Sequence, residues 1–492
     1  MASRVGGAVV SACAGWPRRA VVELRRVPIE LALVAVIGVV AVLKPGESVG
    51  VALVAIAGAL LGARSPLVAL YAVALAWAPL HLPLLHAQLA HRANIDLSVS
   101  RVLGVALPAG LLLALLRARR SVPRLPGPFV AFAAFCVLYA LLGARAPSHS
   151  LAASDVARVG AGGIMLFAAF AFITGRRELK ILGRLVVVAG LVVAIVTLVQ
   201  FVLVHADESL AVRLFGSSFF ERSYAPGFQS YTIRVHGLVG SANENSNFLF
   251  VSIAFALAVD ALVRPARARD AFDLIVAAVC AIAITATATR TTIAALVILG
   301  VWWLVLSRGR FNLQPRVLIR RKGVMLAVAA ATVALAATVS LTNVGSRLSD
   351  ASPTSGRGFA QGRGAVWKNE VSLLRHGSTA DLLVGRGVHR SYVVVHLNGV
   401  SRESPHDVPL WLLVETGLLG AALYYVFYGG TIVRLARGRR EAYLAQIGVA
   451  VLTAYLAIEA FILTVAAPAH RWYMMLFVGA VTRLCSEPPA EA

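Results

Sequence analysis

The sequence predicts an all-α fold: a polytopic helical membrane protein with about 12–14 transmembrane helices. Hydrophobic residues make up 59% of the 492 positions, charged residues only 14%, and the mean hydropathy is +0.79. Soluble globular domains carry about 25% charged residues, so this composition excludes a soluble globular protein. Apolar runs of the roughly 17–25 residues needed to cross a bilayer recur from residue 28 to the C-terminus, and such runs also exclude a β-barrel.

Fourteen apolar segments are candidate spans, separated by short basic or Pro/Gly-containing breaks. They lie near residues 28–43, 49–63, 66–85, 99–116, 128–144, 158–175, 181–204, 246–263, 271–289, 291–307, 323–343, 408–433, 443–466 and 470–485. Two intervening segments, about 205–245 and about 344–407, are too long to be simple turns. The chain therefore divides into N-terminal transmembrane helices over 1–343, a large loop over 344–407, and three C-terminal transmembrane helices over 408–492.

The arginines and lysines predict the orientation. With the N-terminus in the cytoplasm and alternating spans, every basic cluster of the short loops falls inside, as the positive-inside rule requires. These clusters lie at 117–124, 176–184, 264–269, 308–322 and 434–440. We expect a multi-pass protein of the cytoplasmic (inner) membrane with both termini cytoplasmic and both long segments extracytoplasmic. The basic N-terminus leads into apolar sequence without a small-residue cleavage site, which indicates an uncleaved first helix.

Composition argues against several other kinds of partner. The net charge of +23 would suggest nucleic acid in a soluble protein, but topology accounts for most of these arginines and there is no RNA-binding motif. The cysteines are isolated, so no disulfide framework is expected. They are Cys13, Cys136, Cys280 and Cys485. We expect no metal and no cofactor, because the acids of the long segments are scattered, without an Asp-x-Asp pair for a divalent ion.

A histidine stands where the large loop re-enters a long apolar helix. Asp407 has the chemistry of an N-cap, and Pro409 is tolerated in a first helical turn. His406 would then lie just outside the positive end of this helix, which attracts anions and disfavours protonation of the imidazole. His406 is therefore a candidate general base facing a phosphate-bearing substrate; the alternative is an interfacial residue that only caps a loop.

Arg290 joins two apolar runs with almost no loop, inside the sequence Thr-Ala-Thr-Arg-Thr-Thr. A guanidinium between two spans is costly unless it is paired or lines a wet cavity, and such charges are functional by default. One interpretation is a guanidinium that holds phosphate bidentately in an outer vestibule. The alternative is an arginine that reaches the outer headgroups.

The large loop carries eight basic residues against five acidic ones. Such a loop suits an anionic ligand such as a lipid pyrophosphate or an acidic glycan; the alternative is contact with anionic headgroups. Within it, Trp367, Val371 and Leu374 have helical spacing, and Arg363 lies one turn before Trp367. We expect an amphipathic helix there, with Arg363 near its positive end.

The segment from Arg234 to Asn247 ends the first long segment and begins a span. Its asparagines, Asn243, Asn245 and Asn247, are typical of a helix start. The same amides are also able to orient a sugar.

Together these segments resemble the O-antigen ligase and polymerase family of membrane glycosyltransferases. The family pattern is His, then Asn, Ser or Gln, nine residues, Gly, two residues, and Gly, Thr or Tyr. His406, Asp407, residues 408–416, Gly417 and Gly420 match this pattern here, with Asp407 as the departure from it. The resemblance extends to the arginine after a Thr-rich helix end, the Arg-three-residues-Trp element and the Asn-rich helix entry. These lie at Arg290, Arg363–Trp367 and Asn243–Asn247, and the resemblance covers about residues 230–435.

The resemblance implies a C-type glycosyltransferase fold with its active site on the outer face of the membrane. The donor would be a glycan on a polyprenyl pyrophosphate, the acceptor a glycan or lipid hydroxyl, and the reaction metal-independent and inverting. It implies that His406 takes the proton of the acceptor hydroxyl while Arg290 and Arg363 neutralise the departing pyrophosphate. The substrate-binding residues would be Arg234, Asn243, Asn245, Trp367, Asp407 and Glu415.

Three functions compete at this point. A ligase transfers a finished glycan to an acceptor, whereas a polymerase transfers the growing glycan to a new repeat unit, and both would use the same residues. A transporter would instead predict internal repeats, broken mid-membrane helices and several charges deep in the spans. The sequence has no clear repeat, and its candidate intramembrane acids are chiefly Glu415, Asp260 and Glu459.

Overall fold

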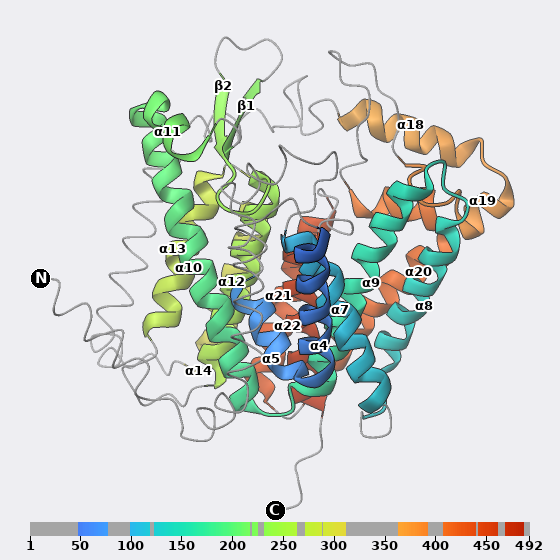
Figure 1. The fold of residues 1–492 in the computed structure, drawn as a ribbon, viewed down its shortest axis with the longest axis horizontal. Coiled ribbons are helices and arrows are strands. Elements are labelled where there is room, and N and C mark those ends of the chain that lie inside the picture. Colours follow the sequence, from blue (N-terminus) through green and yellow to red (C-terminus); the bar gives the residue numbers. More distant parts are fainter. Residues whose placement is uncertain are drawn as a thin grey trace, which may run out of the picture.

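The fold is known from a computed structural model, which describes residues 48–76, 99–118, 123–216, 219–224, 231–262, 271–287, 289–310, 363–391, 407–438, 441–460 and 468–486. Most of these residues form helices that run side by side in one bundle (Figure 1). The helices are α4 (Ser48–Arg64), α5 (Pro66–Ala76), α7 (Val99–Ala118), α8 (Gly127–Gly143), α9 (His149–Phe172), α10 (Arg176–Ala206), α11 (Glu208–Phe215), α12 (Ala242–Leu262), α13 (Ala271–Ala286), α14 (Arg290–Arg310), α18 (Arg363–Arg375), α19 (Thr379–Val384), α20 (Val408–Arg437), α21 (Ala442–Glu459) and α22 (Pro468–Ser486).

The polytopic all-α fold class is confirmed. Twelve of the fourteen predicted spans coincide with a described helix, and the other two, 28–43 and 323–343, lie outside the described residues. Among the described residues, five helices are long and apolar enough to cross a membrane, namely α9, α10, α12, α20 and α21, and shorter apolar helices accompany them. The protein is therefore a multi-pass membrane protein.

Helix α12 is the centre of the bundle, and α10 lies at its periphery. Nearly every side chain of α12 is buried, and this helix packs against α10, α13, α21 and α22. In contrast, α10 exposes an apolar stripe at helical spacing, formed by Val188, Val192, Ile195, Val199 and Val202. A contiguous exposed apolar stripe on a long helix is the surface that lipid chains cover in a membrane protein.

The first long segment departs from the all-α expectation. It forms α11 and then a two-stranded antiparallel hairpin, β1 (Phe220–Tyr224) and β2 (Tyr231–Val235), in which Glu221 pairs with Arg234. The alternation of β-branched, aromatic and polar residues in Tyr-Thr-Ile-Arg-Val is typical of a strand. The hairpin and α11 lie at the same end of the bundle as α18 and α19, so elements of both long segments gather at one end (Figure 1).

Two arginines at the edges of predicted spans lie within helices. Helix α9 begins nine residues before the predicted edge of its span, so Arg158 falls inside it, where Asp155 one turn earlier compensates its charge at 3.5 Å. Arg471 lies in α22 and is buried. An arginine that is paired or shielded by aromatic rings is tolerated within an apolar helix.

Arg471 belongs to a polar network inside the bundle. Its guanidinium carbon lies 5.7 Å from the ring centre of Phe132 and 5.9 Å from that of Tyr424. The buried carboxylate of Glu459 accepts hydrogen bonds from the hydroxyls of Tyr424 at 2.7 Å and Tyr428 at 3.1 Å. Charges of opposite sign and phenols from α20, α21 and α22 thus lie together in the buried interior of the bundle.

Helix α20 is broken near its start by Gly417. This residue has φ +64° and ψ −169°, so the regular pattern of backbone hydrogen bonds stops there. The turn after α19 fits into the break: the backbone N–H of Arg386 donates to the carbonyl of Val414 at 2.9 Å, and that of Gly387 to the carbonyl of Glu415 at 3.1 Å. The kink leaves the carbonyls of Val414 and Glu415 without partners in α20, and the turn after α19 supplies the hydrogen bonds instead.

We predict that Gly417→Ala destabilises the protein by about 3 kcal/mol. A Cβ at this position would lie 2.5 Å from the backbone nitrogen of Gly385, and the φ of +64° is itself strained for alanine. The measurement is the apparent Tm of the purified variant in detergent, together with its abundance in membranes.

Gly429→Ala is the matched control in the same helix. A Cβ there meets nothing within 4 Å, so this variant should keep or slightly raise the apparent Tm. Equal Tm values for the two variants would show that the seating of the turn in the kink contributes nothing to stability.

Candidate functional site

Arg234 on β2 lies where two helices begin. Its guanidinium donates to the side-chain oxygen of Asn243 at 2.7 Å, to the hydroxyl of Thr289 at 3.2 Å and to the carbonyl of Thr287 at 3.3 Å. Asn243 is in the first turn of α12, and Thr289 immediately precedes Arg290, the first residue of α14. Both helix starts carry partial positive charge, and the guanidinium of Arg234 adds to it, so this place suits an anion. We call it the arginine cluster, because Arg234 here meets Thr289, the residue before Arg290.

Buried polar side chains fix the backbone around the arginine cluster. The amide of Gln200 on α10 binds Gly237 twice, accepting from its N–H at 2.9 Å and donating to its carbonyl at 3.2 Å. Asn245 donates to the hydroxyl of Thr197 at 2.9 Å and packs against Gly237, which has φ +64°. Asn245 therefore holds the turn between β2 and α12, and its predicted substrate contact stays a prediction.

Asp407 caps the start of α20, as predicted. Its side chain accepts a hydrogen bond from the backbone N–H of Leu410 at 2.7 Å, and Pro409 lies in the first turn. Helix α18 packs against α20 and matches the predicted amphipathic helix, with Trp367 half-buried. These two elements position the backbone on either side of the predicted catalytic loop.

Glu415, about two turns into α20, is the centre of a buried polar cluster. Its carboxylate accepts hydrogen bonds from the hydroxyl of Ser391 at 2.5 Å and from that of Tyr139 on α8 at 3.3 Å, and the backbone N–H of His389 also donates to it. All of these donors come from elements other than α20. Glu415 thus fastens the turn after α19 onto two helices and does not project into open space.

His389 extends this cluster to α9. Its Nε2 lies 2.9 Å from the carboxylate of Asp155, and its φ of +65° is unusual for a residue other than glycine. Arg158 lies 3.5 Å from the same carboxylate and also interacts electrostatically with Glu244 in the first turn of α12. Charged groups therefore connect the Glu415 cluster to the helix start beside Arg234.

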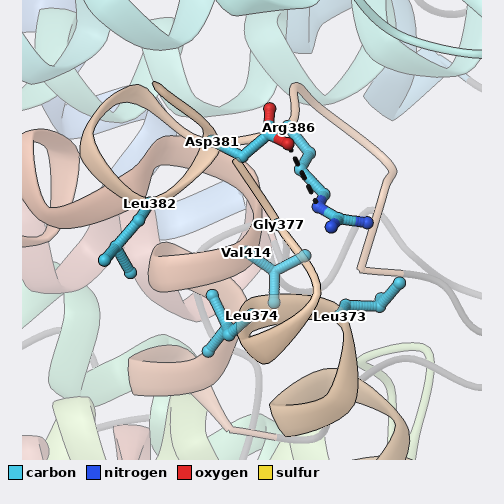
Figure 2. A pocket seen from close by; sticks show the side chains of 7 residues that line it. All are labelled: Leu373, Leu374, Gly377, Asp381, Leu382, Arg386 and Val414. Carbon is cyan, nitrogen blue, oxygen red and sulfur yellow. Dashed lines mark ion pairs between the residues drawn. The ribbon is translucent and has the colours of Figure 1, made fainter. Parts of the chain in front are cut away.

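A small pocket lies between α18, α19 and α20 (Figure 2). Its lining residues are Leu373, Leu374, Gly377, Asp381, Leu382, Arg386 and Val414. Asp381 is 3.8 Å from Arg386, and the backbone N–H of Ser378 donates to the Asp381 carboxylate at 3.2 Å. That hydrogen bond and the nearby guanidinium hold the pKa of Asp381 below its ordinary value. The walls are mostly aliphatic, so the pocket is a packing feature of the large loop.

The predicted catalytic residues are described only in part. His406 lies outside the described residues. Arg290 and Arg363 are the first residues of α14 and α18, and the structure describes their backbone but not their side chains. Arg234 and Asn243 are brought together by a direct hydrogen bond. In the described ranges, no group of His, Cys, Asp or Glu is arranged to hold a metal ion.

Four residues of the site were not predicted from the sequence: Tyr139, Asp155, His389 and Ser391. Asp155 carried a signal, because a single acid inside an apolar helix is expensive and needs a partner. The signal for His389 was weaker: the nearby glycines at 385 and 387 indicate a backbone with positive φ angles. Tyr139 is one of several aromatic residues of α8 and has no such signal.

These observations define a multi-pass membrane protein with charged and polar groups gathered at one end of its bundle. Residues 275–425 match the family model described as O-Antigen ligase. Over these residues the chain is similar to the O-antigen ligase family, which confirms the resemblance inferred from the sequence. The matched segment contains positions 290, 363 and 406, whereas Arg234 and Asn243 precede it. A search of curated proteins found no match.

We predict that Arg234→Ala weakens the binding of inorganic pyrophosphate about tenfold, or roughly 1.4 kcal/mol. The variant removes a guanidinium from the start of α12 and α14 and leaves the helix ends in place. The measurement is the concentration of pyrophosphate that half-maximally raises the apparent Tm of the purified protein.

Arg213→Ala serves as the control for net charge. Arg213 is an exposed residue of α11 in the same segment, so its loss should leave pyrophosphate binding within about twofold. If the two variants weaken binding equally, the effect is one of total charge and the arginine cluster is not the anion site.

Proposed function

We propose that the protein transfers a glycan from a polyprenyl-pyrophosphate carrier to an acceptor hydroxyl on the outer face of the cytoplasmic membrane. The single observation that carries this proposal is the arginine cluster, in which Arg234 joins the starts of α12 and α14 beside Arg290. A diphosphate leaving group needs concentrated positive charge, fixed in advance of the reaction. The family match and the membrane fold support the same substrate class.

In the proposed reaction, His406 accepts the proton of the acceptor hydroxyl as its oxygen attacks the anomeric carbon of the donor. The bond between that carbon and the pyrophosphate oxygen breaks, and its electron pair leaves with the pyrophosphate. Arg290 and Arg363 neutralise the developing charge, with Arg234 as a third cation. Attack opposite the leaving group inverts the anomeric configuration, and no metal ion takes part.

The position of Asp407 supports the role of His406. Asp407, which follows His406 in the chain, caps α20 through its side chain. A helix start disfavours a charged imidazole placed beside it, and a general base requires the neutral form.

We predict that His406→Ala lowers the rate of glycan transfer at least about 100-fold, the usual contribution of a general base. The measurement is product formation by purified protein from a polyprenyl-pyrophosphate-linked oligosaccharide. Membrane abundance and apparent Tm should stay normal. His376→Ala is the matched control, since His376 is exposed at the end of α18 and should retain full activity. Near-normal transfer by the His406 variant would remove this residue from the mechanism.

We also predict that Arg290→Lys lowers kcat more than it raises KM. The substitution replaces the planar, two-pronged guanidinium by a single ammonium charge. It therefore weakens first the stabilisation of the transition state, in which charge builds up on the departing pyrophosphate. The check is steady-state kinetics against donor concentration. A change in KM alone would assign Arg290 to ground-state binding.

A polymerase that uses the same residues is the second candidate, and a product assay separates it from the ligase. The purified protein is incubated with a lipid-linked repeat unit alone, and the lipid-linked products are sized. The ligase that we propose leaves the chain length unchanged until a second acceptor is added. Lengthening without that acceptor identifies the polymerase.

A further inference from the structure

Glu370 on α18 is buried without a hydrogen bond. Its exposed fraction is 0%, and neither carboxyl oxygen has a hydrogen-bond partner in the described part of the chain. Burying a carboxyl group without such a partner is costly, and native structures keep few of these groups. Each such group needs an explanation, and a ligand that supplies the missing partner is one of them.

The groups that face Glu370 are acidic. Asp407 and Glu415, both on the packed helix α20, interact with it electrostatically. Of the basic residues on its own helix, Lys368 and Arg375 are exposed. Burial first, and these two carboxylates next, raise the pKa of Glu370 to about 9. At neutral pH the side chain therefore keeps its proton and is a hydrogen-bond donor.

Glu370 is also close in the chain or in helix register to residues assigned to catalysis. It follows Trp367 by three positions and Arg363 by seven, so the three share one face of α18. Its neighbour Asp407 directly follows His406 in the chain. A neutral acid is thus placed where the large loop meets the start of α20.

We propose that Glu370 is a substrate-binding residue of the transfer site, which in its uncharged form donates a hydrogen bond to an oxygen of the lipid-linked donor. This inference rests on the proposed function and adds a residue to it. An uncharged donor suits this place because an ionised carboxylate beside Asp407 would repel the pyrophosphate.

The test compares Glu370→Gln, which keeps a neutral donor of similar shape, with Glu370→Leu, which removes it. At pH 7 we expect the glutamine variant to retain kcat/KM within about fivefold of the parent, and the leucine variant to lose about 50-fold. Above about pH 9 the parent should lose activity as Glu370 ionises, whereas the glutamine variant should not. Glu208→Gln, which replaces an acid of α11, should follow the parent at every pH.

Binding separates the two kinds of oxygen that the donor offers. The apparent Tm is measured with added undecaprenyl pyrophosphate and, separately, with undecaprenyl pyrophosphate bearing an oligosaccharide. If Glu370 binds a phosphate oxygen, the leucine variant responds less than the parent to both compounds. If it binds a sugar oxygen, the variant responds less only to the glycosylated one. Equal responses of parent and leucine variant to both compounds would overturn the proposal.

Stability against pH supplies a readout that needs no substrate. Because the folded-state pKa of Glu370 is raised above its unfolded value, its burial lowers stability progressively as pH rises from about 4.5 to about 9. The apparent Tm of the glutamine variant should therefore exceed that of the parent by a margin that grows over this range and then levels off. A constant margin would show that Glu370 ionises normally, which would overturn the proposal.

These experiments distinguish a failure of the Glu370 proposal from a failure of the proposed glycan transfer. If the parent protein transfers no glycan but the leucine variant still binds the carrier more weakly, transfer fails and the binding role of Glu370 stands. If transfer proceeds and both variants match the parent at every pH, the role of Glu370 fails and transfer stands.

Discussion

The site depends on one contact: the turn after α19 packs into the break that Gly417 makes in α20. Backbone N–H groups of Arg386 and Gly387 replace the helical partners that Gly417 removes from α20. Neither Gly385 nor Gly417 has room for a side chain, since a Cβ on either would lie within 2.5 Å of the other segment's backbone. With the turn seated, Ser391 and His389 meet Glu415 and Asp155, and four elements are fixed to one another.

Among the described residues, the buried carboxylates show how charge is accommodated inside this protein. The carboxylates of Asp155, Glu415 and Glu459 are each met by a cation or by hydroxyl donors from another element, which is the way buried charge is tolerated. Among the described residues, Glu370 has neither, and it stands next to the loop to which we assign the chemistry. A buried acid without the partners that the other buried acids have is more typical of a functional site than of a purely structural one.

Most of the helices, and part of the site, were accessible from the sequence. Long apolar runs identify helices because backbone hydrogen bonds must close within each span, and the cap at Asp407 and the amphipathic spacing around Trp367 are local signals. The His389–Asp155 pair and the hydrogen bond from Tyr139 to Glu415 depend on tertiary contacts between segments far apart in the chain. No local pattern encodes those contacts. In the sequence, Gly417 is recognisable only as a position of the family pattern. The reason for a glycine there is the turn that packs against it, and this contact is visible only in the structure.

The length of α10 sets the height at which a carrier lipid meets the protein. Its 31 residues extend about 46 Å, roughly 16 Å more than a hydrocarbon core. Gln200, near its C-terminal end, holds the turn that follows Arg234, so the guanidinium is level with the end of this helix rather than with its apolar middle. Under the proposed function, only the headgroup and the sugars nearest to it reach the protein. The remainder of a long polysaccharide stays in the surrounding water, so an enzyme of this shape tolerates chains of very different length.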